Sequence, residues 1–364
     1  MHISTLTLRD FRNYSMESIS FSPGTNVIYG DNAQGKTNIL EAVYLFNRGK
    51  SHRTKSDAEI VRFGSQRASA IMEFSDRHRE FKGIIQIDRG GKKAVKINNV
   101  AIAKLSKLMN YFHAVLFSPE DLMLVKGSPG QRRRFMDAAI SQLYPKYLVS
   151  LTAYQKAMMQ KNSLLKILRK NGKKSDPTLS VWNDSMAREG AVIMKYRGEF
   201  LAAMGLFAAG IQKEISGEEL RLEYRPSVGD GTGEMDYNAL YQYLEERSGR
   251  EIEMASAQYG IQRDDIGVLI NGRDAKIYGS QGQKRTAALS LKMAQAEHIN
   301  DVREEYPVLL LDDIMSELDT GRRNYLNEKI RDKQVLITCT DADILPLSGG
   351  SKLIRVRDGH ISDG

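Results

Sequence analysis

Residues 30–37 read Gly-Asp-Asn-Ala-Gln-Gly-Lys-Thr and fit the phosphate-binding loop pattern G-x-x-x-x-G-K-[ST]. An apolar run at 25–29 predicts a buried strand before the loop, and apolar side chains at helical spacing predict a helix from 35 to about 46. In such a loop, glycines let backbone N–H groups face a polyphosphate, and the helix N-terminus favours negative charge. We expect Lys36 to lie exposed and to reach the β- and γ-phosphates, and the Thr37 hydroxyl to bind Mg²⁺. A glycine-rich turn without a ligand is the alternative.

Two adjacent carboxylates end a second apolar run. Residues 308–311 predict a buried parallel strand, and Asp312 and Asp313 follow it directly. Beside a phosphate loop, Asp312 can hold Mg²⁺ and Asp313 can polarise a water molecule. Two acids at a strand end are also common as N-caps or solubilising groups. The segment Ser316, Glu317, Leu318, Asp319 follows within one helical turn.

A third segment, 278–286, opens a helix that is rich in Ala, Leu and Met. It contains Ser280, Gln281, Gly282 and Gln283. The open N-terminus of such a helix is a second anion-binding geometry. Taken alone, the segment is more typical of a capped surface helix, but its position shortly before the Asp312–Asp313 strand favours a functional role.

Charge is distributed unevenly along the chain, whose formal net charge is +8. Residues 126–174 hold twelve basic residues and one acidic residue, whereas residues 214–253 hold eleven acidic and four basic ones. A localised anionic partner such as nucleic acid is therefore more plausible than a diffuse one. Arg132, Arg133 and Arg134 are the leading candidates for DNA contact, although such a run is more often a solvated or internally paired helix face.

The sequence patterns around these residues predict an α/β chain with a helical insertion. Short apolar runs at 3–8, 70–74, 83–87, 94–97 and 114–117 predict strands, with a hairpin turn at Gly90–Gly91. Two amphipathic helices of about 25 residues, separated by the polar break 171–177, predict an antiparallel hairpin. It either packs on the core or projects as an arm. We expect residues 1–122 and 251–364 to form the two halves of one α/β domain around the insertion 123–250.

Composition excludes several classes of protein. With 364 residues, 41% hydrophobic residues and 8 prolines, the chain is neither disordered nor of low complexity. One cysteine, Cys339, excludes a disulfide framework and a cysteine-based zinc cluster. No signal peptide or membrane-spanning stretch is apparent, so we expect a soluble cytoplasmic protein.

Together these motifs resemble those of the SMC-related group of ABC-type ATPases. The phosphate loop, the Ser-Gln-Gly-Gln signature, the Leu-Leu-Leu-Asp-Asp strand and the Ser-Glu-Leu-Asp loop occur in that order around the insertion. A finer resemblance, to the RecF family of bacterial recombination and repair proteins, runs from end to end. It is carried by segments 8–14, 30–41, 51–54, 117–122, 126–129, 132–137 and 280–286.

The resemblance implies an ABC-type P-loop ATPase head with an inserted helical hairpin, which dimerises on ATP and hydrolyses it slowly as a switch. It also implies ATP and Mg²⁺ as cofactors, binding to double-stranded and gapped DNA, and action with RecR and RecO in loading a recombinase. The implied catalytic residues are Asp313, Asp312 and Lys36, with Thr37 and Asp312 on the metal. Implied ATP contacts are Gly30, Asp31, Asn32, Ala33, Gln34, Gly35, Lys36, Thr37, Arg12 and Asn13. Ser280, Gln281, Gly282 and Gln283 would act in trans, and Ser316, Glu317, Leu318 and Asp319 would form the D-loop.

The sequence departs from the family pattern at several positions. Gln262 stands where the family usually has His, and Asp313 stands where ABC transporters have a catalytic Glu. Because the shorter carboxylate lies farther from the water, we expect slow turnover. The switch His has no equivalent, so Thr340 or Asp341 would have to serve, and the metal-sensing Gln has no clear position.

Two other functions remain open at this point. One is an SMC-like or ABC ATPase subunit that drives a transporter or another machine. The other is a scaffold in which the nucleotide fold is only structural. ATP hydrolysis measured with and without DNA would separate them.

Overall fold

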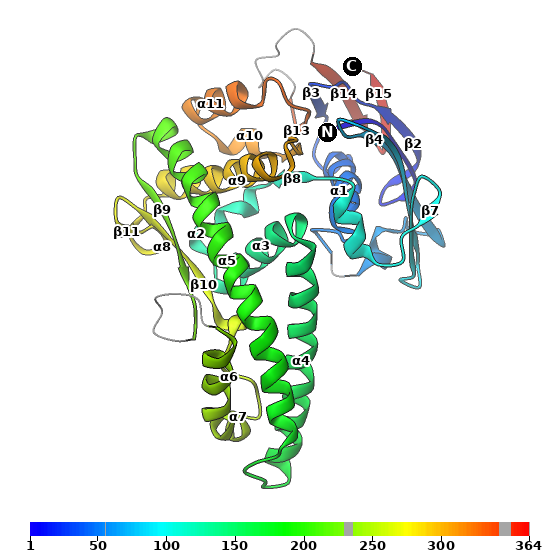
Figure 1. Cartoon of the computed structure of the whole chain (residues 1–364). Coiled ribbons are helices and arrows are strands. Elements are labelled where there is room, and N and C mark those ends of the chain that lie inside the picture. The colour runs from blue at the N-terminus through cyan, green and yellow to red at the C-terminus, as the bar shows by residue number, and fades with distance from the viewer. Residues whose placement is uncertain (55, 229–235, 342–350, 364) are drawn as a thin grey trace. The chain divides into compact units, whose positions relative to one another are not determined.

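A computed structural model describes residues 1–54, 56–228, 236–341 and 351–363 (Figure 1). The chain forms two compact units, Met1–Asp121 with Gln295–Gly364, and Leu122–Ala294. The first boundary lies within one residue of the expected one. The second lies 44 residues beyond residue 250. Pairing of β10 (Asp265–Ile270) with β9 (Leu220–Arg225) keeps residues up to 270 with the insertion, and bonds from Gln283 to Glu218 and from Ser290 to Gln212 keep the residues after them there. Asp230 and Glu234 of the acidic segment lie outside the described residues.

A six-stranded sheet in the first unit carries the phosphate loop. Its order is β15 (His360–Asp363), β14 (Lys352–Arg357), β3 (Thr25–Tyr29), β13 (Val335–Cys339), β12 (Val308–Asp312) and β8 (Ala114–Phe117). All neighbours pair in parallel except β14 and β15. Asp312 pairs with Thr338, and Cys339 pairs with Tyr29. The register therefore brings the loop after β3 and the two carboxylates after β12 to the same edge, as predicted.

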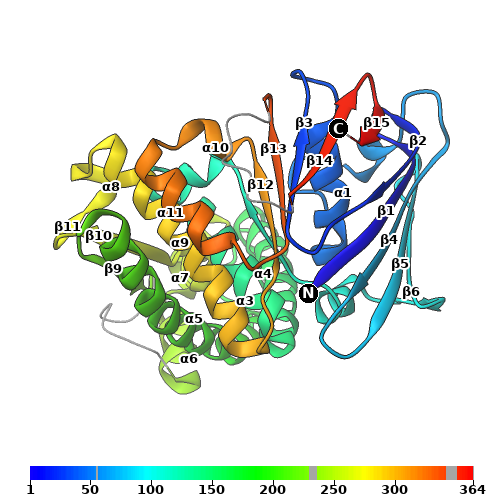
Figure 2. The ribbon, with the colours of Figure 1, turned by 90° about the horizontal axis from the view of Figure 1, so that it is seen from above.

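A second sheet of the first unit is antiparallel throughout. Its order is β2 (Tyr14–Ser20), β1 (His2–Phe11), β4 (Arg67–Ser75), β5 (Glu80–Asp88), β6 (Lys93–Ile97) and β7 (Val100–Ala101). The predicted turn at Gly90–Gly91 joins β5 to β6, with Gly91 at φ 80°. Helix α1 (Lys36–Arg48) lies between the two sheets (Figure 2). Its buried side chains, such as Leu40 and Phe46, share one core with both sheets.

Short helices complete the first unit. They are η1 (Asp57–Ile60), η2 (Leu105–Asn110), η3 (Pro119–Leu122), α10 (Ile314–Glu317) and α11 (Thr320–Ile330). Helix η3 directly follows β8 and α10 directly follows β12, so both begin at the edge that carries the phosphate loop.

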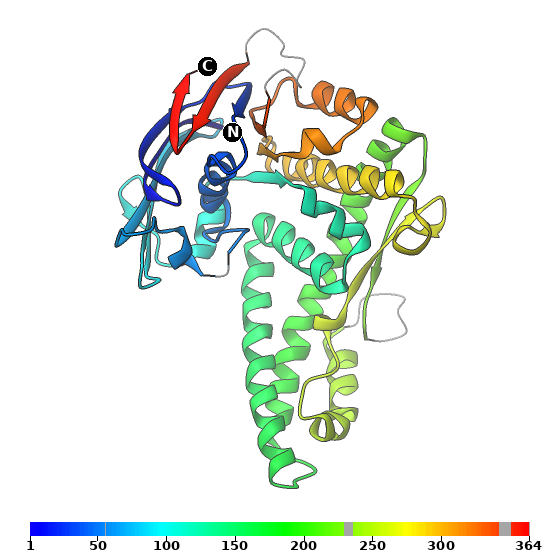
Figure 3. The same cartoon turned by 180° about the vertical axis from the view of Figure 1, so that it is seen from behind.

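The second unit is built around the predicted helical hairpin, α4 (Pro145–Lys170) and α5 (Thr178–Ser216), which lie side by side in Figures 1 and 3. Helix α5 has 39 residues rather than about 25, because buried positions recur from Leu179 to Gln212. It ends where Gly217 adopts the left-handed conformation, φ 71°. The remaining elements are α2 (Met123–Lys126), α3 (Pro129–Leu143), α6 (Tyr237–Glu246), α7 (Ser248–Met254), η4 (Ile261–Arg263), β11 (Arg273–Asp274), α8 (Ala275–Tyr278) and the part of α9 (Gln281–Arg303) that precedes Gln295.

The hairpin buries its apolar stripes within its own unit. Helix α6 packs on α5, and α7 packs on α4. At the loop end, Leu165, Leu168 and Leu179 cluster with Ile252 and Ala257. Over the residues described, no helix combines the length and apolar character needed to cross a membrane.

Candidate nucleotide site and signature motif

The phosphate loop is shaped by two glycines in conformations that other residues rarely adopt. Gly30 has φ 147°, and a Cβ there would lie 2.2 Å from the Val356 carbonyl oxygen of β14. Gly35 has φ 118°, and a Cβ there would lie 2.6 Å from Asn13 Nδ2. In the described chain no side chain caps α1, so its first N–H groups are not satisfied by a capping residue. The loop and helix start thus have the geometry that favours binding of an anion.

Lys36 is buried, contrary to the expectation that it lies exposed. Only 4% of the residue is accessible, because it begins α1 beneath the loop that it closes. Its Nζ donates to the carbonyl oxygens of Gly30, 2.7 Å away, and Asp31, 2.9 Å away. These bonds hold the ammonium inside the loop, where a phosphate oxygen would compete for it.

Thr37 and Asp312 meet across 275 residues of sequence. The Thr37 hydroxyl donates to Asp312 Oδ1 at 2.9 Å. Thr338, which the sequence analysis did not select, donates to the same oxygen at 2.8 Å and accepts from the Asp313 N–H at 2.9 Å. Only the strand register identifies Thr338, because this register makes Thr338 the partner of Asp312 on β13.

Asp313 lies in a distinct environment from Asp312. It adopts the left-handed conformation, φ 50°, at the start of α10, and its carbonyl accepts from the Ser316 hydroxyl at 2.8 Å. Burial raises the pKa of the Asp313 carboxyl, the neighbouring Asp312 charge raises it further, and Lys36 acts in the opposite direction. A more basic carboxylate is better suited to accept a proton from water.

The donor set suits a magnesium ion held jointly with a ligand. Thr37 and Asp312 offer hard oxygen donors, and Mg²⁺ prefers one or two such groups together with phosphates and water. Over the residues described, no cluster of three or more His, Cys, Asp or Glu could hold a metal alone.

Arg12 is held by Glu41 of α1, a contact that the sequence analysis did not anticipate. Its guanidinium makes two bonds to the fully buried carboxylate, at 2.8 and 2.6 Å, and a third to the Glu59 carbonyl at 2.7 Å. Ser51 also donates to Glu41, and Arg53 lies 3.6 Å from it. Although burial acts against it, these partners keep the pKa of Glu41 below its ordinary value. The 51–54 segment, quoted above for its resemblance, thus anchors to α1.

Asn13 lies against the loop, as expected for a residue near the nucleotide. Its Nδ2 donates to the Gln34 carbonyl at 2.8 Å. The turn between β14 and β15 supports this contact, because the Asp358 N–H donates to Gln34 Oε1. A Cβ on Gly359 would lie 2.9 Å from the Asn13 carbonyl oxygen. The role of this C-terminal turn was not apparent from the sequence.

His52 lies among the charged side chains around Asp312. Burial lowers the pKa of its imidazole, while the charges of Glu41, Asp312 and Glu120 act against that shift and Arg53 acts with it. Its Nδ1 is buried without a hydrogen-bond partner. Glu120 follows β8, the strand beside β12. His52 and Glu120 therefore lie close enough to Asp312 and to each other for their charges to interact.

The D-loop segment begins on α10 and ends as the start of α11. Asp319 caps α11 by accepting from the Arg322 N–H at 3.0 Å, and Leu318 is buried. Ser316 and Glu317 are exposed. The contact of this segment with a second subunit stays a prediction.

The signature segment lies in the second unit, and its helix is capped as the alternative interpretation allowed. The Ser280 N–H donates to Gln283 Oε1 at 2.8 Å, and Ser280 Oγ accepts from the Gln283 N–H at 3.2 Å. Ser280 and Gln281 are exposed, whereas Gly282 and Gln283 are partly covered. The action of these residues in trans stays a prediction.

Two of the three consecutive arginines bond within the second unit. Arg132 is 6% exposed and makes a two-bond pair with Asp265, at 2.6 and 2.7 Å. Arg133 donates to the Asp264 carbonyl at 2.6 Å. Arg134 is exposed. The internally paired alternative therefore describes Arg132 and Arg133, and Arg134 keeps the exposure that a DNA contact requires.

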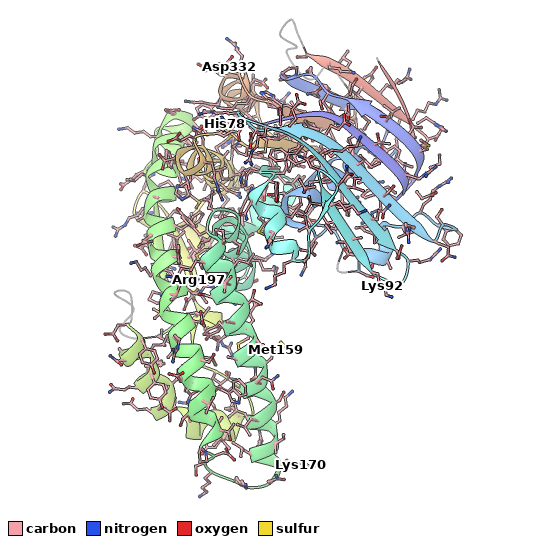
Figure 4. All side chains as sticks on the ribbon, turned by 45° about the vertical axis from the view of Figure 1, so that its right-hand side comes forward. His78, Lys92, Met159, Lys170, Arg197 and Asp332 are labelled. Carbon is pink, nitrogen blue, oxygen red and sulfur yellow. The ribbon has the colours of Figure 1, made fainter. Side chains whose placement is uncertain are left out.

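The Gly260–Asp265 segment is part of a buried polar network. Arg197 of α5, labelled in Figure 4, lies 2.7 Å from Asp264 and 2.8 Å from Asp137. Gln262, at the position of the family His, accepts from the Tyr154 hydroxyl at 2.5 Å. Gln262 and Asp264 therefore have a structural role, because they join the helical hairpin to the segment that leads into β10.

The sheets, the phosphate loop and the paired carboxylates define the class of SMC-related ABC-type ATPase heads. The family model for the "RecF/RecN/SMC N terminal domain" matches residues 2–361. The Smc head domain of Pyrococcus furiosus has the same fold, with a TM-score of 0.57 at 16% identity over 99% of this chain and 95% of that one.

Within that class, the chain belongs to the RecF family of DNA replication and repair proteins. It is 40% identical to the RecF protein of Ruminiclostridium cellulolyticum over 99% of each chain. It is also 40% identical to that of Staphylococcus carnosus, over 99% of this chain and 100% of that one. A solved structure of the recombination mediator protein RecF with ATP, from the RecFOR pathway, has a TM-score of 0.93 at 33% identity and covers 100% of this chain and 97% of that one.

Proposed function

We propose that the chain is an ATP-dependent switch that acts on DNA in recombinational repair and replication. ATP and Mg²⁺ bind the first unit, ATP draws two copies together, and slow hydrolysis releases them. The dimer binds duplex or gapped DNA in the cytoplasm and acts with RecR and RecO to help load a recombinase. Family membership and the RecF–ATP structure support this proposal.

The observation that carries the nucleotide part is the contact between Thr37 and Asp312, 2.9 Å, beside a loop with two left-handed glycines. A structural scaffold has no need for a hydroxyl and a carboxylate at the start of an uncapped helix. When bound, Mg²⁺ would draw negative charge from the terminal phosphates.

The chain's own residues would divide the remaining work. Lys36 would turn from the Gly30 and Asp31 carbonyls to a phosphate oxygen, and the α1 N–H groups would hold the phosphates. Thr338 would keep Asp312 and the Asp313 backbone in place. Asp313 would accept a proton from the attacking water, and its short side chain is consistent with slow turnover.

The test of this proposal replaces Lys36 with methionine, which fills the buried space but removes the ammonium. We expect ATP affinity to fall by about tenfold or more, because hydrogen bonds from a charged donor contribute about 1.5–3 kcal/mol each. Titration calorimetry with ATP and Mg²⁺ measures it, and thermal unfolding confirms that the variant folds. Lys50→Met, at an exposed position after α1, is the matched control. Equal affinity in all three proteins would refute the assignment.

A further inference from the structure

The capped start of α9 depends on where the Gln283 side chain lies. Gln283 Oε1 accepts from the Ser280 N–H at 2.8 Å, and Ser280 Oγ accepts from the Gln283 N–H at 3.2 Å. These reciprocal bonds form a capping box. Because Ser280 Oγ accepts one bond here, its own hydrogen remains to be donated to another acceptor.

The nitrogen of the Gln283 side-chain amide bonds to Glu218. Gln283 Nε2 donates to Glu218 Oε1 at 2.6 Å. A carboxylate is a strong acceptor, so it fixes which way the amide faces, with nitrogen toward Glu218 and oxygen toward Ser280. An unconstrained Gln could turn and break the box.

The last turns of α5 keep Glu218 in place. Glu218 follows Gly217, the residue that ends α5, and its Oε2 accepts from Ser216 Oγ at 3.1 Å and from Gln212 Nε2 at 3.3 Å. Gln212 also accepts from the Ser290 hydroxyl at 3.0 Å, and both of these side chains are fully buried. Since Gln283 and Ser290 lie about two turns apart on α9, hydrogen bonds connect the end of α5 to α9 at two successive positions.

We propose that Glu218 is a positioning residue that orients Ser280 toward a terminal phosphate of ATP bound by a second copy of this chain. The inference rests on the proposed ATP-dependent dimer and adds to it the residue that prepares the signature before the phosphate arrives. Ser280 and Gln281 are exposed, so this surface of the helix is open to a partner. Glu218 itself would touch neither nucleotide nor partner.

The experiment measures dimerisation by light scattering over a range of protein concentrations with saturating ATP and Mg²⁺. Glu218→Ala should raise the concentration of half-dimerisation by roughly tenfold, the effect of losing one hydrogen bond to a charged group. Glu218→Gln keeps an oxygen that can accept from Gln283, so it should restore dimerisation close to wild type. Glu219→Ala, at the next and exposed position, should match wild type. ATP affinity of the monomer should be the same in all four proteins, because the phosphate loop is untouched.

A second comparison, made in a protein that lacks the Gln283 amide, distinguishes an effect of Glu218 on the signature from an effect on overall stability. In a Gln283→Met protein the amide is gone, so adding Glu218→Ala should change the half-dimerisation concentration no further. If Glu218→Ala has the same effect with and without Gln283, Glu218 does not act through the signature, and the inference is overturned. It is also overturned if wild type and Glu218→Ala dimerise alike. If wild-type protein stays monomeric with ATP, the proposed function fails first.

Discussion

Thr338 shows how a residue that no motif marks can organise a site. It is fully buried, donates to Asp312 and accepts from the Asp313 backbone. The sequence motifs predicted Lys36, Thr37, Asp312 and Asp313 because these residues lie at short, characteristic spacings. Thr338, Glu41 and Glu218 could not be found in that way, since each acts through a partner distant in sequence and gains its role only from strand register or helix packing.

His113 leads to a prediction about acid stability. The residue is buried, its Nδ1 lacks a hydrogen-bond partner, and burial together with the Arg303 charge lowers its pKa from 6.5 to about 3. Below pH 6.5 the His113 imidazole takes up a proton in the unfolded chain, whereas in the folded chain it stays neutral until the pH approaches its lowered pKa. The free energy of unfolding should therefore fall by about 1.4 kcal/mol per pH unit between pH 6 and pH 4 on this account alone.

The measurement is urea unfolding at several pH values for wild type and His113→Gln. The variant should lose that part of the slope, whatever its stability at neutral pH. His78→Gln, at an exposed position marked in Figure 4, should keep the wild-type slope. An unchanged slope in His113→Gln would contradict the assignment.

Among the helices, α4 carries one charged residue within its apolar stripe, and an ion pair explains that residue. Lys161 interrupts the apolar stripe of α4, yet it is fully buried and lies 2.5 Å from the fully buried Glu251 of α7. Glu251 Oε1 also accepts from the backbone N–H groups of Gln258 and Tyr259. The ion pair therefore holds α7 and the loop after it on the hairpin.

Breaking this pair from one side should be costly. Lys161→Met leaves a buried charge without its partner and should lower the free energy of unfolding by about 3–5 kcal/mol. The double variant Lys161→Met with Glu251→Gln removes both charges, keeps an acceptor for the two N–H groups, and should recover much of that loss. Chemical unfolding measures both, with Lys166→Met, exposed on the same helix, as the control. A small loss in Lys161→Met would show that α7 does not depend on the pair.

Most elements of the ATPase head could be predicted because their apolar runs are short and bounded. The long helix α5 was underestimated, since its stripe continues through polar and small residues such as Asn183 and Gly190 that are buried by packing. The second domain boundary was misplaced for a related reason. Pairing of β10 with β9 is a contact between distant parts of the chain, which no short sequence pattern marks.

At the scale of the whole molecule, the excess of positive charge is concentrated on a surface of the second unit. Helix α4 contains no Asp or Glu in 26 residues, and its exposed cations are Lys146, Lys156, Lys166, Arg169 and Lys170. Met159 and Lys170 mark this helix in Figure 4. Since Arg132 and Arg133 bond internally, a triple change at 132–134 would damage the fold, and the α4 lysines are the better test of DNA contact.

We expect Lys156, Lys166 and Lys170 changed together to Glu to weaken binding to gapped duplex and to reduce the slope of log affinity against log salt by about 2–3, if each meets a phosphate. Arg77, Lys92 and Lys96, which are exposed on the first unit, can be changed to Glu as a control with the same change in net charge. Fluorescence anisotropy at several salt concentrations gives both quantities. Equal slopes for the two triple variants would exclude α4 from the DNA surface.

In the proposed function, ATP joins two copies of this chain through the signature of one and the phosphate loop of the other. Light scattering at micromolar concentration tests it most directly, with wild type and Ser280→Arg each measured with Mg²⁺ and either ATP or ADP. Ser280 is exposed, so arginine disturbs no core, but it fills the space that a phosphate would approach. We predict a dimer only for wild type with ATP, and unchanged ATP affinity in the Ser280→Arg monomer. A wild-type protein that stays monomeric with ATP, or a Ser280→Arg protein that still dimerises, would contradict this mechanism of dimerisation.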